Sequence, residues 1–159
     1  MPGEEFPATE EQANSLLIEA ESSFEAGLIE IAAGLYMKAS GLFTKLASTA
    51  KDEVKLELYL TKAAYSDFMR AYCEAIALRS SIDEDVMMGR EVRPDKLVEL
   101  KRLIRLADKC LREAVKRAEK LKKPAAENEE LGEELAELLK MVKRKTEGFL
   151  DFKGQVEHL

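Results

Sequence analysis

The feature that most constrains this chain is a long stretch, from Thr9 to Ser81, that has no proline and repeats apolar residues at helical spacing. Proline would interrupt a helix because it lacks a backbone N–H and fixes φ. The apolar residues recur three or four positions apart, which places them along one face of a helix. No segment alternates apolar and polar residues as a half-buried strand does. The chain is therefore predicted to be all-α.

Local signals divide the apolar pattern into five predicted helices joined by turns. Thr9 and Gln12 have the form of a capping box, and Gly27 is suited to end the first helix. Pro94 fits the first turn of the fourth helix, and Asn128 can cap the fifth. Pro124 is expected to stop the fourth helix. The predicted helices cover residues 9–26, 29–48, 51–80, 94–123 and 129–150.

We expect these helices to form one domain over residues 1–159, because a chain of this length can bury a core of its own. The predicted architecture is an antiparallel bundle of about five helices. Its expected parts are a flexible arm (1–8), a three-helix part (9–80), a loop (81–93), a two-helix part (94–150) and a loose tail (151–159).

The composition is that of a globular protein, with 46% apolar and 35% charged residues. No run approaches the ~18 apolar residues that a membrane-spanning helix needs. The first fifteen residues lack the basic and then apolar order of a signal peptide, so the expected location is the cytoplasm. Asn and Gln are scarce while Lys and Glu are abundant, a bias typical of thermophiles.

The residues that carry enzyme chemistry are sparse. The chain has one histidine, His158, and no glycine-rich phosphate loop, which predicts a non-enzymatic protein without a cofactor. Cys73 and Cys110 do not form a metal-ligand pair, so no metal site is expected. We expect both cysteines to be reduced core residues, and a disulfide between them stays open.

Residues 13–65 contain short runs with a family resemblance. Ala26-Gly27 precedes the second predicted helix, and Leu35-Tyr36 is followed by Ala39 after two residues. Tyr59-Leu60 is followed by Ala63 at the same spacing. This arrangement resembles the three-helix MIT (microtubule interacting and trafficking) domain, and its small and aromatic positions are also similar to those of a tetratricopeptide repeat.

The resemblance implies a protein-binding module, an adaptor that holds a helical or short peptide segment of a partner in a groove between the second and third helices. The candidates for this groove are Met37, Leu58 and Phe68 as apolar contacts, with Glu53 and Glu57 facing a basic residue of the partner. A second interpretation stays open, in which the apolar candidates belong to the core and the glutamates to a solvated face.

A basic face on the fourth predicted helix points to a different class of partner. Residues 90–123 contain thirteen Lys or Arg against six Asp or Glu, a local net charge of +7 in a chain of net charge −6. At 100° per residue, one side of the helix collects seven cations over ~33 Å. They are Lys101, Arg105, Lys109, Arg112, Lys116, Lys120 and Lys123.

Such a face could bind the phosphates of nucleic acid or an anionic membrane surface. It could also pair with the acidic helices of the same chain, or with a second copy in a homodimer. The helix has no aromatic residue to stack on bases, and the whole chain is acidic. Nucleic acid and membrane are therefore less favoured partners than protein, and a merely solvated face stays open. A structural bundle that forms a homodimer through exposed parts of its long helices also stays open.

Overall fold

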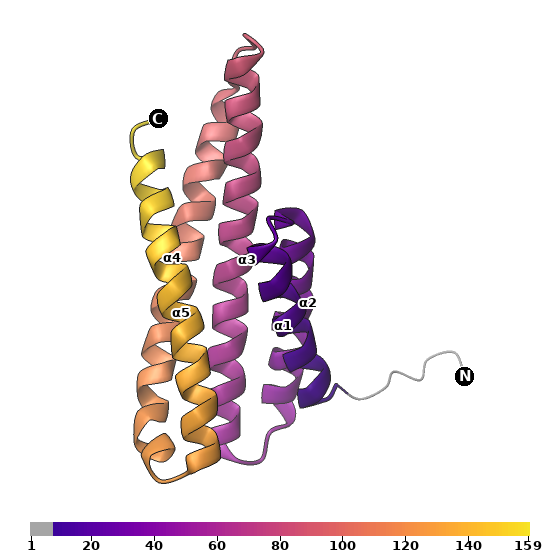
Figure 1. Cartoon of the computed structure of the whole chain (residues 1–159), viewed down its shortest axis with the longest axis vertical. Helices are drawn as coiled ribbons and strands as arrows, with labels where there is room; N and C mark the ends of the chain where they lie inside the picture. Colours follow the sequence, from indigo (N-terminus) through magenta and orange to yellow (C-terminus); the bar gives the residue numbers. More distant parts are fainter. Residues whose placement is uncertain (1–7) are drawn as a thin grey trace, which may run out of the picture.

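The computed structural model describes residues 8–159 and contains five α-helices that pack against one another (Figure 1). No strand occurs within this described part of the chain, which confirms the predicted all-α bundle. Apart from Ala8, the arm expected at residues 1–8 lies outside the described residues. The helices are α1 (Glu10–Glu25), α2 (Ile29–Thr49), α3 (Glu53–Met87), α4 (Pro94–Ala126) and α5 (Glu129–Val156).

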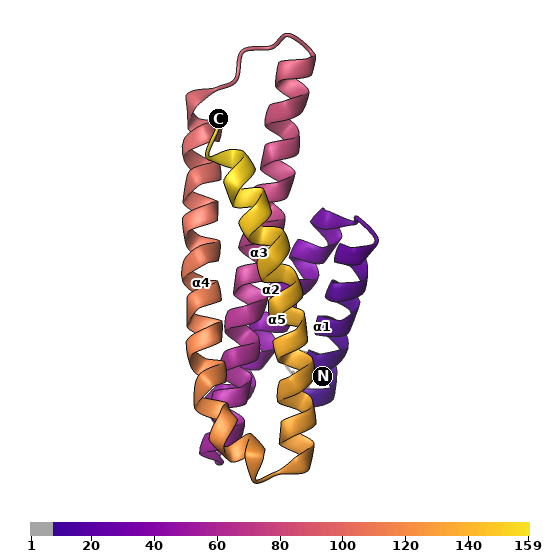
Figure 2. The ribbon, with the colours of Figure 1, turned by 60° about the vertical axis from the view of Figure 1, so that its left-hand side comes forward.

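The longest helix, α3, lies at the centre of the arrangement. The hairpin of α1 and α2 packs on one side of α3 through α2, and α4 runs along the other side (Figure 1). The last helix, α5, turns back along α4 and contacts α3, and in Figure 2 it runs in front of α3 from beside α1 to the upper part of α4. The end of α3 and the start of α4 extend beyond the α1–α2 hairpin, and this tip exposes Val86, Met87 and Met88 (Figures 1 and 2).

The predicted helix starts are confirmed by their capping contacts. The backbone N–H of Gln12 donates to Oγ1 of Thr9 at 3.1 Å, and the N–H of Thr9 donates to Oε1 of Gln12 at 3.2 Å. Pro94 occupies the first turn of α4, where no intrahelical N–H is needed. Asn128 caps α5 by accepting from the N–H of Leu131 at 3.1 Å.

The predicted end of the third helix was wrong, because α3 continues from residue 80 to Met87. The loop is therefore residues 88–93 rather than 81–93. Two contacts hold the added turns in place. Ile82 is only 2% exposed and packs in the core, and Nε of Arg79 donates to Oδ1 of Asp83 at 3.0 Å. Gly89, with φ of 68°, then turns the chain out of the helix.

The predicted ends of the last two helices were also too early. Pro124 lies within the last turn of α4, which ends at Ala126 instead of residue 123. The proline costs α4 only the one hydrogen bond that its missing N–H would donate, and its carbonyl still accepts from the N–H of Glu127 at 3.2 Å. The expected loose tail at 151–159 is helical as far as Val156, which is 3% exposed and anchors the last turn of α5.

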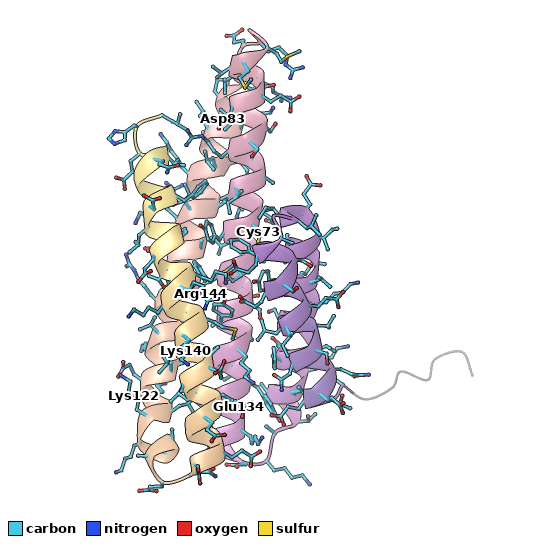
Figure 3. The ribbon with its side chains drawn as sticks, in the orientation of Figure 1. Cys73, Asp83, Lys122, Glu134, Lys140 and Arg144 are labelled. Carbon is cyan, nitrogen blue, oxygen red and sulfur yellow. The ribbon has the colours of Figure 1, made fainter. Side chains whose placement is uncertain are left out.

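A cluster of aromatic rings fills the core where α3 meets α5. The ring centroid of Phe149 lies 5.3 Å from those of both Phe68 and Tyr72, with the planes close to perpendicular. This edge-to-face geometry is favourable for aromatic pairs. Nearby, Cys73 (labelled in Figure 3) is buried and Cys110 is half-buried, and both are free thiols. Cys73 is thus a core residue as expected, whereas Cys110 lies at the edge of the core.

None of the helices between residues 8 and 159 combines the length and apolar content required to cross a bilayer.

Candidate functional site

The basic face predicted on the fourth helix is present on α4, the helix that lies along one edge of the molecule in Figure 2. All seven predicted side chains are exposed to solvent. They follow one another at intervals of three or four residues, so they form a row along the outer side of the helix. We call this row the basic stripe: Lys101, Arg105, Lys109, Arg112, Lys116, Lys120 and Lys123.

The cations of α4 that lie outside the basic stripe are held in ion pairs. Nη2 of Arg102 lies 2.6 Å from Oε1 of Glu99, and Nη1 of Arg117 lies 3.1 Å from Oε1 of Glu57 on α3. Arg93, Lys96 and Lys122 are paired as well. These carboxylates neutralise the sides of α4 that face or flank the rest of the bundle.

The basic stripe differs in this respect. Arg112 is paired with Asp108, whose Oδ2 lies 2.6 Å from Nη2. Within residues 8–159, none of the other six stripe cations has a carboxylate oxygen within 4.0 Å. Six positive charges therefore face solvent along one helix without an ion-pair partner among residues 8–159.

The groove predicted between the second and third helices is not assembled by the fold. Met37, on α2, is 46% exposed and remains accessible. Leu58 and Phe68, on α3, are fully buried, so their prediction as partner contacts was wrong. Both side chains lie in the core, where Phe68 packs against the ring of Phe149 and has no surface to offer.

The two acidic groove candidates have separate surroundings. Glu53 is exposed in the first turn of α3. Glu57 is partly buried and accepts from Arg117 of α4 at 3.1 Å, so it already has a cationic partner inside the bundle. Glu53 therefore lies at the start of α3, and Glu57 belongs to the contact between α3 and α4.

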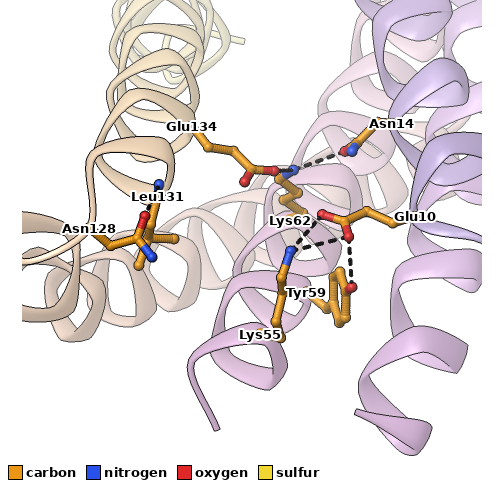
Figure 4. A network of polar contacts seen from close by, with 8 residues as sticks. All are labelled: Glu10, Asn14, Lys55, Tyr59, Lys62, Asn128, Leu131 and Glu134. Atoms are coloured by element: carbon orange, nitrogen blue, oxygen red, sulfur yellow. Dashed lines mark hydrogen bonds and ion pairs between the residues drawn. The ribbon is translucent and has the colours of Figure 1, made fainter. Parts of the chain in front are cut away.

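A buried polar network, which the sequence analysis missed, joins α1, α3 and α5 (Figure 4). Nζ of Lys62, on α3, lies 2.6 Å from Oε1 of Glu134 on α5 and 2.9 Å from Oδ1 of Asn14 on α1. The Lys62 side chain is only 6% exposed. One turn away, Lys55 and Tyr59 both donate to the Glu10 carboxylate of α1, at 3.2 and 3.0 Å.

A second buried lysine continues the network. Nζ of Lys145, on α5, lies 2.7 Å from Glu21 and 2.9 Å from Glu25, both on α1. Its hydrogen bond lowers the pKa of Glu25, and the hydroxyl of Tyr65 donates to Glu21 as well. The sequence did carry a signal for Lys145, since it lies three positions after Val142 and four before Phe149, on the apolar face of α5.

The chemistry of this buried region favours a structural role. Burial raises the pKa of Cys73 to about 12, so its thiol stays protonated and unreactive near neutral pH. Burial likewise raises the pKa of Tyr65 well above its ordinary value. In the part of the chain that the structure describes, no three His, Cys, Asp or Glu side chains are grouped to hold a metal ion. The hydrogen bonds and ion pairs of the network connect α1, α3 and α5.

No model of a protein family, no curated protein and no solved structure matches the chain significantly.

Proposed function

We propose that the protein is a non-enzymatic adaptor that binds an acidic segment of a partner protein along the basic stripe of α4. One observation carries this proposal: within residues 8–159, α4 neutralises its other cations with its own or neighbouring carboxylates and leaves six of the seven stripe cations unpaired. A row of unpaired like charges repels itself, and an acidic partner relieves that repulsion.

The geometry of the stripe suits a helical partner. Its cations recur every three or four residues, and the carboxylates of an acidic amphipathic helix recur at the same interval and rise. A partner helix lying along α4 can therefore meet several cations in succession. Each exposed pair contributes little, ~0.2–1 kcal/mol, but a row of pairs adds up and also accelerates association.

An acidic protein segment is favoured over nucleic acid by two features. The α4 sequence contains no Phe, Tyr or Trp on which a base could stack. The net charge of −6 also repels a long polyanion, whereas a short acidic segment responds mainly to the local positive charge. The class of function expected from the sequence, protein binding, is thus kept, and the proposed surface moves from the α2–α3 groove to α4.

The test is a charge reversal in the middle of the stripe, Arg105→Glu, Arg112→Glu and Lys116→Glu together. The probe is a labelled synthetic helical peptide with glutamate at every third or fourth position, and binding is measured by fluorescence anisotropy. We expect the affinity to fall more than about tenfold, because three attractive pairs of up to ~1 kcal/mol each become repulsive. Circular dichroism should show an unchanged helix content, since all three side chains are exposed.

A matched control reverses three exposed cations elsewhere: Lys38→Glu and Lys45→Glu on α2, with Lys140→Glu on α5. Equal weakening by the control and the stripe variant would mean that only net charge matters, and the proposal would be wrong. Tighter binding of an RNA or DNA probe than of the peptide, lost in the stripe variant, would assign the stripe to nucleic acid instead.

A further inference from the structure

A hollow lies between α4 and α5 near the end of α5, at one end of the basic stripe. Its volume is about 320 Å³, and Ile104 of α4 and Val156 of α5 form its floor, where they are only 7% and 3% exposed. Lys101, Arg105 and Lys153 surround this floor and add the apolar stems of their side chains to the lining. Glu157, directly after α5, is the remaining residue that lines the hollow. The hollow therefore combines an apolar interior with three cations drawn from two helices.

The fold explains why this hollow is open. The last helix ends at Val156, whereas α4 and α3 continue past that level (Figure 2). Ile104 and Val156 are both buried, so the little surface that they keep is the edge of the core at the end of α5 rather than an isolated exposed side chain.

The three cations around the hollow are incompletely neutralised. Within residues 8–159, the one carboxylate within 4.0 Å of Lys153 is Asp108, with Nζ and Oδ1 3.9 Å apart, and Asp108 lies closer to Arg112. Within residues 8–159, Lys101 and Arg105 have no carboxylate oxygen within 4.0 Å. The charge of the hollow thus complements an acidic ligand, and its interior complements an apolar group on the same ligand.

We propose that this hollow is the anchor pocket of the basic stripe. It accepts one large apolar side chain, such as leucine, from the acidic segment, while Lys101, Arg105 and Lys153 pair with carboxylates next to that side chain. This inference rests on the proposed function. Binding energy at protein interfaces concentrates where an apolar anchor fills a pocket, whereas exposed charge pairs mainly steer association. The pocket therefore fixes the register of the partner along the stripe.

The first test compares two labelled acidic helical peptides that differ only in one central residue, leucine or alanine. We expect the leucine peptide to bind wild-type protein about tenfold more tightly, in line with the burial of one leucine side chain. In Lys153→Glu, a change outside the basic stripe, this preference should fall several-fold. Lys143→Glu alters an exposed lysine of the same helix away from the hollow, and it should keep the full preference.

The second test observes the pocket directly by methyl NMR of the full chain. The methyl signals of Ile104 and Val156 should shift on addition of the leucine peptide, and much less with the alanine peptide. Ile18 and Ile31, exposed on α1 and α2, provide internal controls whose signals should stay in place.

The outcomes separate the two proposals. Suppose both peptides bind equally, lose affinity in the stripe variant, and leave Ile104 and Val156 unshifted. The anchor pocket is then refuted, and the proposed function stands. If neither peptide binds wild-type protein, both proposals are refuted.

Discussion

The ammonium group of Lys145, on the last helix, lies 2.7 Å from a carboxylate oxygen of Glu21 on the first helix, and its side chain is only 4% exposed. Burial of such a pair costs desolvation energy on both sides, which the close contact and additional hydrogen bonds offset. Glu25, Tyr65 and the ring of Phe24 supply those further contacts. The α1–α5 contact therefore depends on Lys145, because loss of this lysine leaves the buried carboxylate of Glu21 without its cation.

Removal of this lysine should be strongly destabilising. We expect Lys145→Ala to lower the free energy of unfolding by about 3 kcal/mol, because Glu21 is left buried without its cation. Urea unfolding followed by circular dichroism measures the change. Lys140→Ala, an exposed lysine on the same helix, should stay within about 0.5 kcal/mol of wild type. Similar losses in the two variants would contradict a special role for Lys145.

Two buried tyrosines should respond differently to loss of their hydroxyl groups. Tyr65 donates to Glu21, so Tyr65→Phe should cost about 2 kcal/mol, the usual effect of losing a hydrogen bond to a charged group. Burial and the nearby Glu21 carboxylate raise the pKa of the Tyr36 hydroxyl, which makes no hydrogen bond of normal geometry within the described residues. We therefore expect Tyr36→Phe to cost less than about 0.5 kcal/mol or to stabilise the protein. The reverse order in thermal or urea unfolding would show that Tyr36 makes the more important bond.

Two glycines should give opposite effects when replaced by alanine. Gly41 lies inside α2 with open space around the position of a Cβ atom, so Gly41→Ala should stabilise by about 0.5–1 kcal/mol through helix propensity. Gly27 has φ of 80° at the α1–α2 turn, a conformation that costs alanine about 1–2 kcal/mol. Urea midpoints should move up for the first variant and down for the second. A gain in both would argue against strain at Gly27.

Stability should fall in alkaline solution. Burial raises the pKa of Tyr72 and Cys73 to about 12, from ordinary values of 10.0 and 9.0 that they regain on unfolding. Above pH 9 the unfolded chain releases protons that the folded chain retains, so the free energy of unfolding decreases as pH rises. This stabilisation is complete below pH 9 and is lost as pH approaches 12. Urea unfolding at about pH 8 and about pH 10.5 tests it, and equal midpoints would contradict it.

The helix starts could be predicted from the sequence because capping chemistry is local. Thr9 and Gln12, or Asn128 and Leu131, are three positions apart, and each pair makes its bond without help from another helix. The end of α3 is different. Its extension past residue 80 depends on burial of Ile82, and Lys96 of α4 donates to Asp85 at 2.7 Å. A contact between helices of this kind is not visible in a local pattern.

The basic stripe could be predicted because exposure of a helix face follows from periodicity alone. The groove residues could not, since an apolar residue on α3 has the same pattern whether it lines a groove or the core. The position of α5 decides between the two, and Phe149 of α5 lies against Phe68. The burial of Lys62 was missed for the same reason. It requires both α1 and α5 to pack against this part of α3, where Asn14 and Glu134 bond the lysine.

The bonds of Lys145 to Glu21 and Glu25 connect residues 124 and 120 positions apart, whereas α1–α2, α2–α3, α3–α4 and α4–α5 all pack as neighbours in the chain. Contacts between neighbours close short loops and form early, and a contact of long range follows once most chain entropy has been lost. We therefore expect the Lys145 bonds to be absent from the folding transition state, so that their loss speeds unfolding and leaves the folding rate nearly unchanged. This lysine then governs how long the native state lasts, and the helical hairpins govern how quickly it forms.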